Sequence, residues 1–129
     1  QSGDAYYSMG LLLSQLNKSD EARAHLAKAS KLLPSRPRVH YNYALSLEQN
    51  GQLTEAIDVI VGFVKRDDRD VSLLQSLIRL YVKSGTPKKG LPYAFASHFA
   101  TAQLLEALNI YHNEYYQLIQ EVTDSLEAK

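Results

Sequence analysis

Apolar residues recur along most of this chain at spacings of three and four, which place them on one face of an α-helix. The pattern is clearest between residues 37 and 70, where two amphipathic runs follow one another. The first run reads R-V-H-Y-N-Y-A-L-S-L-E-Q and ends at Asn50–Gly51, and the second reads L-T-E-A-I-D-V-I-V-G-F-V. Because a glycine commonly ends a helix, the stretch predicts a helix pair over about Arg38–Gln49 and Thr54–Lys65.

The same pattern recurs with a period of 34 residues on both sides of this helix pair. The residues related by one period are Gly10 and Ala44, Leu13 and Leu47, Ala22 and Ala56, and then Leu47 and Tyr81, Gly51 and Gly85, and Ala56 and Gly90. A fixed period of this length is typical of helical repeat proteins. We therefore expect a single domain over 1–129 with repeats at about 3–36, 37–70 and 71–104.

The first repeat predicts helices over about Asp4–Leu16 and Asp20–Leu33. Asn17 should end the first helix because it tolerates the left-handed conformation, and Pro34 should stop the second. The residues expected to face inward are Tyr6, Met9, Leu13 and Leu16 on the first helix and Ala22, Leu26 and Ala29 on the second.

Small residues stand where the two helices of a repeat would cross, at Gly10, Ala22, Ala44 and Ala56. Two closely crossing helices leave room there only for a side chain near the size of a methyl group. A large residue at Ala56 would overpack the crossing and cost a few kcal/mol.

The third repeat keeps the period but changes in its second half. A helix over about Ser72–Lys83 should end at Gly85, with Leu74, Leu77, Ile78 and Tyr81 facing inward. Thr86–Pro87 resembles a helix start, yet Pro92 follows five residues later, where proline removes a hydrogen bond. We expect either a kink there or a helix that begins only near Leu91.

No helix breaker follows Thr101, and one apolar stripe continues to the end of the chain. The stripe consists of Leu104, Leu108, Tyr111, Tyr115, Leu118, Val122 and Leu126. It predicts a long helix at about 102–127 that caps the repeats, as repeat arrays require for solubility. The expected fold is all-α, a right-handed superhelix of about seven helices.

The chain resembles the tetratricopeptide repeat family, whose unit is a 34-residue helix–turn–helix with small and large residues at fixed places. The resemblance rests on Met9-Gly10-x-x-Leu13 and Tyr43-Ala44-x-x-Leu47, together with Ala22, Leu26, Ala29, Pro34, Ala56 and Ile60. The third repeat matches through Leu77-Ile78-x-x-Tyr81 with Gly90 and Ala94, but Ile78 replaces a small residue and the closing prolines are missing.

The resemblance implies a binding scaffold, not an enzyme, in which the first helices of successive repeats line a concave groove for a peptide or partner segment. Aligned by the repeat, the groove positions are Tyr7, Leu11, Gln15, Arg38, Tyr41, Asn42, Leu45, Gln49, Gln75, Arg79 and Lys83. The subgroup that grips a C-terminal carboxylate has two lysines, two asparagines and an arginine, where this chain has Tyr7, Leu11, Asn42, Ser72 and Ser76. Only Asn42 agrees, which excludes that type of clamp.

The groove positions begin apolar and aromatic and become cationic toward Arg79 and Lys83. Tyrosines are favoured at binding surfaces because they bury area and keep a polar group. This pattern predicts a partner that is apolar at one end and acidic at the other. Alternatively, Tyr7 and Tyr41 only pack between neighbouring first helices.

The composition narrows the choice of partner. Lys plus Arg equals Asp plus Glu at 14 each, so no net charge favours nucleic acid or an anionic membrane. The longest apolar stretch, residues 59–64, is too short to insert into a membrane. The absence of cysteine favours a reducing compartment such as the cytoplasm, and the lack of an initial Met suggests a segment of a longer protein.

Catalytic and metal-binding motifs are not found. The sequence has no phosphate-binding glycine loop, no nucleophile elbow and no H-E-x-x-H, so no cofactor is expected. The histidines, His25, His40, His98 and His112, share no pairing at four-residue spacing. His40 is expected to be a hydrogen-bonded core residue, and residues 66–70 a solvated turn between repeats, not a cation loop.

The tyrosines between Tyr111 and Tyr116 widen the apolar stripe of the terminal helix. Such a band could dock the remainder of a longer protein or a second copy of the chain, or it could simply pack on the third repeat as a cap. Self-association through the repeats and the C-terminal helix is therefore the alternative function.

Overall fold

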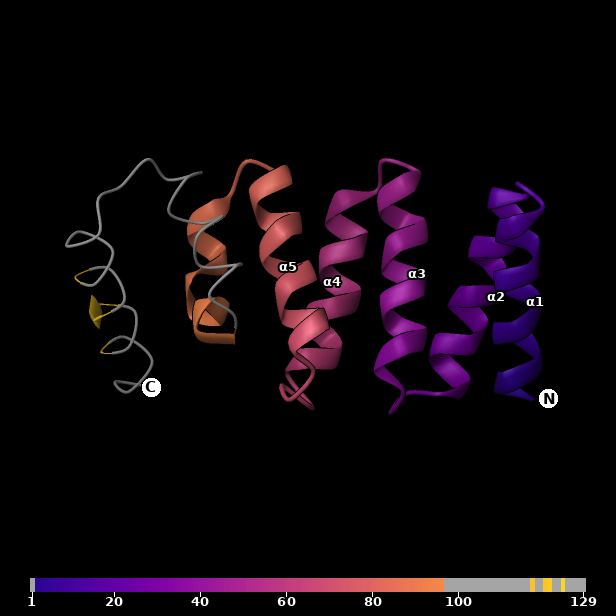
Figure 1. Cartoon of the computed structure of the whole chain (residues 1–129), viewed down its shortest axis with the longest axis horizontal. Helices are drawn as coiled ribbons and strands as arrows, with labels where there is room; N and C mark the ends of the chain where they lie inside the picture. The colour runs from indigo at the N-terminus through magenta and orange to yellow at the C-terminus, as the bar shows by residue number, and fades with distance from the viewer. Residues whose placement is uncertain (1, 97–116, 118–119, 122–123, 125–129) are drawn as a thin grey trace. The chain divides into compact units, whose positions relative to one another are not determined.

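The computed structural model describes residues 2–96, 117, 120–121 and 124. Within these residues the chain is helical and contains no strand, which confirms the all-α prediction. Residues 2–96 form six helices, close to the number expected, and Figure 1 labels α1 to α5. They are α1 (Gly3–Gln15), α2 (Ser19–Leu32), α3 (Pro37–Gln49), α4 (Leu53–Val64), α5 (Val71–Lys83) and the 3₁₀ helix η1 (Pro87–Ala96).

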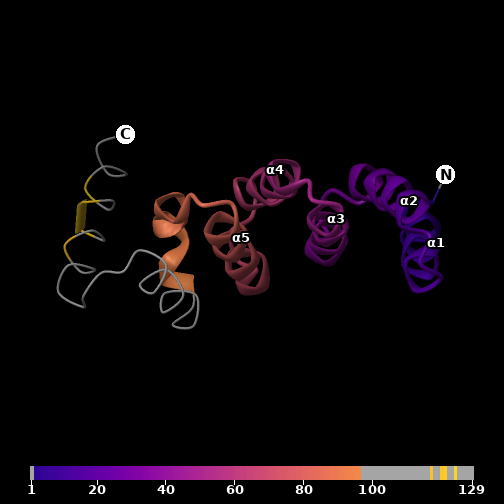
Figure 2. The same cartoon turned by 90° about the horizontal axis from the view of Figure 1, so that it is seen from above.

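The chain divides into two compact units, residues 1–73 and 74–129. The first unit holds α1 to α4, and each of these helices packs against the next one along the chain. Seen from above, α1 and α3 lie in one row, and α2 and α4 in the other (Figure 2). The bounds predicted for the five α-helices agree with the structure to within one residue.

The ends of α1, α3 and α5 share one local geometry. Asn17, Gly51 and Gly85 each have a positive φ, of 60°, 79° and 78°, and they are separated by one repeat period each. The following N–H groups donate to carbonyls five residues earlier: Lys18 to Leu13, Gln52 to Leu47 and Thr86 to Tyr81, each at 2.9 Å. This is the Schellman type of helix end, so the period is present in the backbone as well as in the sequence.

The core of the first unit contains the predicted small residues. Gly10, Ala22, Ala44 and Ala56 are all buried. A Cβ added at Gly10 would lie 2.8 Å from Leu26 Cγ and 2.9 Å from Leu26 Cδ2, so α1 and α2 approach closely there. The inward positions predicted on α2, Ala22, Leu26 and Ala29, are also confirmed as buried.

Two of the residues predicted to face inward on α1 are on the surface. Met9 is 45% exposed and Leu16 is 57% exposed, whereas Gly3, Gly10 and Leu13 are buried. The prediction was wrong because Met9 and Leu16 share a helix face with exposed Leu12, and α2 covers a different side of α1. On α5, Leu77, Ile78 and Tyr81 are buried as predicted, but Leu74 is only half-buried.

The segment after Gly85 is neither a kinked α-helix nor a helix that starts at Leu91. It is a 3₁₀ helix over Pro87–Ala96, with Pro92 inside it. The N–H of Lys89 donates to the carbonyl of Thr86 at 3.1 Å, three residues back. Pro92 has no N–H to donate and its ring clashes with the preceding turn, which disfavours a regular α-helix here. The capping helix expected at about 102–127 lies outside the described residues, except for positions 117, 120–121 and 124.

Candidate partner-binding face

The predicted groove residues fall on three helices. Eight lie on α1 and α3 in the first unit, and Gln75, Arg79 and Lys83 lie on α5 in the second. Gln75 and Arg79 are half-buried, and Lys83 is exposed. In the first unit α1 and α3 lie in the same row, so residues on both helices could contact one partner (Figure 2). We call the eight residues on α1 and α3 the α1–α3 face.

A hydrogen-bond network joins α1 to α3 within this face. Asn42 Nδ2 donates to the Tyr7 hydroxyl oxygen at 2.8 Å and to the carbonyl oxygen of Arg38 at 3.0 Å. The Arg38 carbonyl can only accept, which sets the orientation of the Asn42 amide. Tyr7 and Asn42 are each half-buried, so this polar contact lies at the edge of the surface and not in the core.

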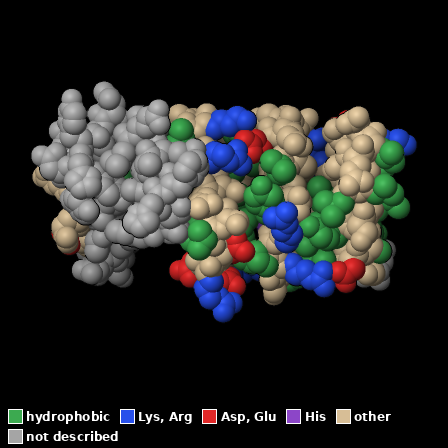
Figure 3. All heavy atoms as spheres, viewed as in Figure 1, with side chains coloured by type: hydrophobic (Ala, Val, Ile, Leu, Met, Phe, Trp, Pro, Cys, Tyr) green, Lys and Arg blue, Asp and Glu red, His purple; other side chains and the backbone are tan. Residues whose placement is uncertain are grey.

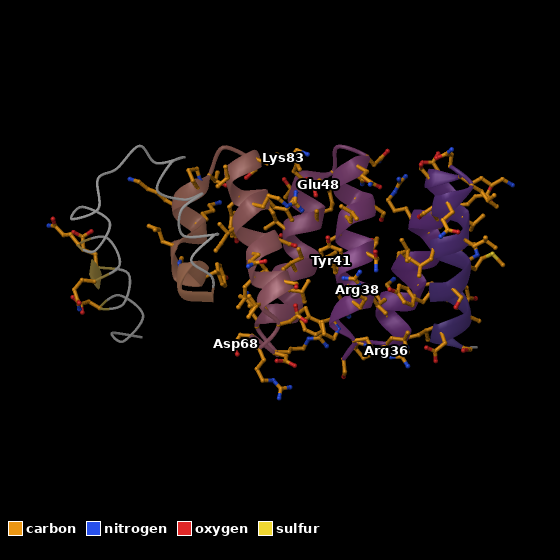
Figure 4. All side chains as sticks on the ribbon, viewed as in Figure 1. Arg36, Arg38, Tyr41, Glu48, Asp68 and Lys83 are labelled. Atoms are coloured by element: carbon orange, nitrogen blue, oxygen red, sulfur yellow. The ribbon has the colours of Figure 1, made fainter. Side chains whose placement is uncertain are left out.

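Arg38 and Tyr41 lie together on the surface of α3 (Figure 4). The guanidinium carbon of Arg38 is 5.2 Å from the centre of the Tyr41 ring, within the range of a cation–π contact. The stacking holds the guanidinium in place while Arg38 remains exposed. In the space-filling view, a blue side chain lies among green ones over α3 and α1 (Figure 3).

The apolar part of the α1–α3 face is only partly covered. Leu11 is 36% exposed and Leu45 is half-buried. Gln15 and Gln49, at the C-terminal ends of α1 and α3, are exposed. The face therefore combines apolar surface, a fixed cation and hydrogen-bonding side chains on two neighbouring helices.

An ion pair that the sequence did not reveal connects the first turn of α1 to the residue before α3. Arg36 Nη1 contacts Asp4 Oδ1, and the side chains are 53% and 63% exposed. The two residues are separated by 32 positions, not by the 34-residue period. No sequence pattern indicates such a contact, because the turn before α3 brings the residues together. An exposed pair of this kind contributes little to stability.

His40 is in the core, as predicted, where it hydrogen-bonds to the backbone but leaves one ring nitrogen without a partner. It is 6% exposed, its ring lies 4.8 Å from that of Phe63, and its Nε2 has no hydrogen-bond partner. Burial is the main cause that lowers the pKa of His40 below 6.5, and the charge of Arg66 acts in the same direction. Backbone hydrogen bonds to Leu33 and Pro34 oppose this shift only in part.

The turn over residues 66–70 is organised by Asp67 and Asp70. The Asp67 carboxylate accepts hydrogen bonds from the Arg69 side chain at 2.8 Å and from the Arg69 backbone at 3.1 Å, which lowers the pKa of Asp67 to about 2. Asp70 Oδ1 accepts from the N–H of Leu73 at 2.9 Å and so caps α5. Among the residues that the structure describes, no group of three or more His, Asp or Glu could hold a metal ion.

Comparisons with known proteins agree with the helix pairs of the first unit. A family model described as Tetratricopeptide repeat matches residues 7–70, from the second turn of α1 to the residue before α5. No curated protein matches the sequence significantly. None of the helices in the described part of the chain has the length and apolar character needed to cross a membrane.

Repeats of this family generally mediate protein–protein interaction and typically serve as non-catalytic scaffolds. The match, the paired helices and the recurring helix ends at Asn17, Gly51 and Gly85 all agree. Residues 7–70 therefore form tetratricopeptide repeats.

Proposed function

We propose that the α1–α3 face binds an extended segment of a partner protein. The observation that carries this proposal is the Tyr7–Asn42–Arg38 network, which fixes polar groups of two helices on a partly exposed surface. A network of this kind that served only packing would be expected deeper between the helices. Here it lies beside the exposed guanidinium of Arg38.

The hydrogen-bonding capacity of the network fits a peptide group. Asn42 uses both of its N–H groups within the chain, which leaves Oδ1 as an acceptor. Tyr7 accepts from Asn42, so its own hydroxyl proton is available for donation. A peptide unit offers one N–H and one C=O, and a chain passing over α1 and α3 could pair with both.

The neighbouring side chains favour a particular partner composition. Leu11 and Leu45 offer apolar surface, while Arg38 offers a cation that the Tyr41 ring holds in position. A carboxylate is the natural partner of such a guanidinium. We propose that Gln75, Arg79 and Lys83 on α5 also contact a partner, and that residues 71–104 form a third repeat.

The test is a double substitution in the α1–α3 face. A peptide is first selected from a random library against the intact chain, and its affinity for Tyr41→Ala/Leu45→Ala is then titrated. We expect affinity to fall by about tenfold or more, since truncating central contacts of an interface costs over about 1 kcal/mol.

The matched control is Ile57→Ala/Val61→Ala, which truncates two half-buried apolar residues on α4. This control should bind the peptide as the parent chain does. Circular dichroism should show equal helicity for both variants. Unchanged affinity in the Tyr41→Ala/Leu45→Ala variant would place the peptide elsewhere and refute the proposal.

A further inference from the structure

The α1–α3 face carries the same three residue types on both of its helices. They follow one another at steps of four residues, which keeps them on one side of each helix. The pairs related by one period are Tyr7 and Tyr41, Leu11 and Leu45, and Gln15 and Gln49. Because α1 and α3 begin at the same end of the unit (Figure 1), each pair forms a band across the two helices. We call them the tyrosine, leucine and glutamine bands.

The chemistry of the face therefore changes along the helices and not across them. A partner chain that crossed from α1 to α3 would meet the same residue type twice, whereas a chain running along the helices would meet all three bands. The tyrosine band is joined across the helices by Asn42, whose Nδ2 donates to the Tyr7 hydroxyl oxygen at 2.8 Å. In all three bands the side chains are half-buried or exposed, so a segment that lies along both helices could contact each band.

The spacing of the bands matches that of an extended chain. Four residues advance an α-helix by about 6 Å. Two residues advance an extended chain by about 6.6 Å, and its side chains point alternately to opposite sides. Every second side chain of an extended segment would thus face one band after another.

The hydrogen-bonding groups of the tyrosine band also favour an extended partner. The Tyr7 hydroxyl proton and Asn42 Oδ1 offer one donor and one acceptor for a peptide unit. The backbone groups inside a helix are already paired with one another, whereas those of an extended segment remain available.

The charge of the face is concentrated at the tyrosine band. The guanidinium carbon of Arg38 lies 5.2 Å from the centre of the Tyr41 ring, which places the cation at this band. Asp4 stands one period before Arg38, but its carboxylate contacts Arg36. The other acidic residue of α1 and α3, Glu48, is only 8% exposed. The tyrosine band is therefore positively charged and complements a carboxylate.

We infer that the α1–α3 face selects an extended segment that carries an acidic, an apolar and an uncharged polar side chain at successive second positions. The acidic side chain meets Arg38 at the tyrosine band, and the other two meet the leucine and glutamine bands. This inference rests on the proposed peptide site and specifies its partner. A side-chain carboxylate leaves the peptide groups of the segment free to pair with Tyr7 and Asn42, so we assign the negative charge to a side chain.

The first experiment measures the spacing. Peptides are selected from a random library against the intact chain, and we expect the selected sequences to share an acidic and an apolar residue two positions apart. One such peptide is synthesised with both ends blocked, and a second version has one serine inserted between these two residues. The insertion keeps the composition but turns the apolar side chain to the other side of the segment. It should lower the affinity by about tenfold or more.

The second experiment reverses the charge. Arg38→Glu should weaken binding of the selected peptide by about tenfold or more, and a peptide with lysine in place of its acidic residue should bind this variant better than the original peptide does. Glutamate is favourable in the first turn of a helix, so α3 should remain folded. Lys31→Glu is the matched control, because Lys31 is exposed on α2 and the change in net charge is equal. It should leave the affinity unchanged.

Three results would overturn the inference while leaving the peptide site in place, provided that Tyr41→Ala/Leu45→Ala still abolishes binding. The first is a set of selected peptides without the two-residue spacing. The second is a spacing of four residues, which would indicate a helical partner. The third is a charge reversal that restores no binding, which would separate the acidic residue from Arg38. A selected peptide that binds Tyr41→Ala/Leu45→Ala as tightly as the parent chain would instead refute the site itself, and the inference with it.

Discussion

Gly10 and His40 are buried residues whose surroundings restrict what can replace them. Gly10 lies against Leu26, which is itself only 1% exposed and cannot move aside. His40 lies against Phe63, with its Nε2 lacking a hydrogen-bond partner. In both cases the sequence indicated a buried position, but only the neighbouring helix determines how tightly it is enclosed.

A leucine at Gly10 should destabilise the first unit. The added Cβ alone would lie 2.8 Å from Leu26 Cγ, so Gly10→Leu should lower the free energy of unfolding by roughly 1–3 kcal/mol, despite the better helix propensity of leucine. Urea denaturation would measure this. Gly62→Leu is the control, since nothing lies within 4 Å of a Cβ at Gly62, and it should not destabilise the chain. Equal effects of both changes would contradict the close approach of α1 and α2.

Stability should fall in acid because of His40. Its folded-state pKa is lowered below 6.5, so the unfolded state binds a proton first as the pH decreases. The contribution of neutral His40 is thus complete above about pH 6.5 and is lost as the pH falls from there toward the lowered folded-state value. Denaturation of the parent chain and of His40→Leu at several pH values from about 8 to about 5 would test this. If the stabilities of the parent chain and of His40→Leu changed with pH in parallel, His40 would not contribute to the loss of stability in acid.

Helix ends are the elements that the sequence predicts best in this chain. Asn17, Gly51 and Gly85 all have a positive φ, as their residue types suggest. The η1 segment is the opposite case. Pro92 indicated a disturbance, but it did not reveal that the whole of Pro87–Ala96 would be a 3₁₀ helix. A proline removes one bonding pattern without specifying which other pattern replaces it.

Two glycines should respond in opposite ways to the same substitution. Gly51 has a φ of 79°, so Gly51→Ala should destabilise the chain by about 1 kcal/mol or more. Gly62 lies within α4 and has open space around it, so Gly62→Ala should stabilise by about 0.5–1 kcal/mol. Thermal unfolding of both variants would measure the difference. A loss of stability in Gly62→Ala would show that α4 needs a glycine for another reason.

For the molecule as a whole, α1 carries partly exposed apolar side chains on two sides. Tyr7 and Leu11 belong to the α1–α3 face proposed for a peptide, while Met9 and Leu12 are exposed outside it. The two sides can therefore be tested independently. Met9→Lys should leave the affinity for a selected peptide unchanged in the titration that tests Tyr41→Ala/Leu45→Ala. A loss of affinity in Met9→Lys would mean that the peptide reaches the other side of α1.

The sequence placed the residues of the candidate site on α1 and α3 but did not indicate how they contact one another. The repeat alignment pointed to Tyr7 and Asn42, which hydrogen-bond to each other, and to Arg38 and Tyr41, which stack. It could not indicate these contacts themselves, because they depend on the distance between α1 and α3. The ion pair of Asp4 and Arg36 was missed for the same reason.

The sequence by itself determined the helices, their bounds and their 34-residue period. These features depend on local rules: the spacing of apolar residues, and the conformations available to Asn17, Gly51 and Gly85. Only the tertiary structure decided which apolar residues are covered, since Leu13 is buried whereas Met9 and Leu16 are exposed. Burial is a property of neighbouring surfaces, and a helix pattern identifies an apolar face without stating what packs on it.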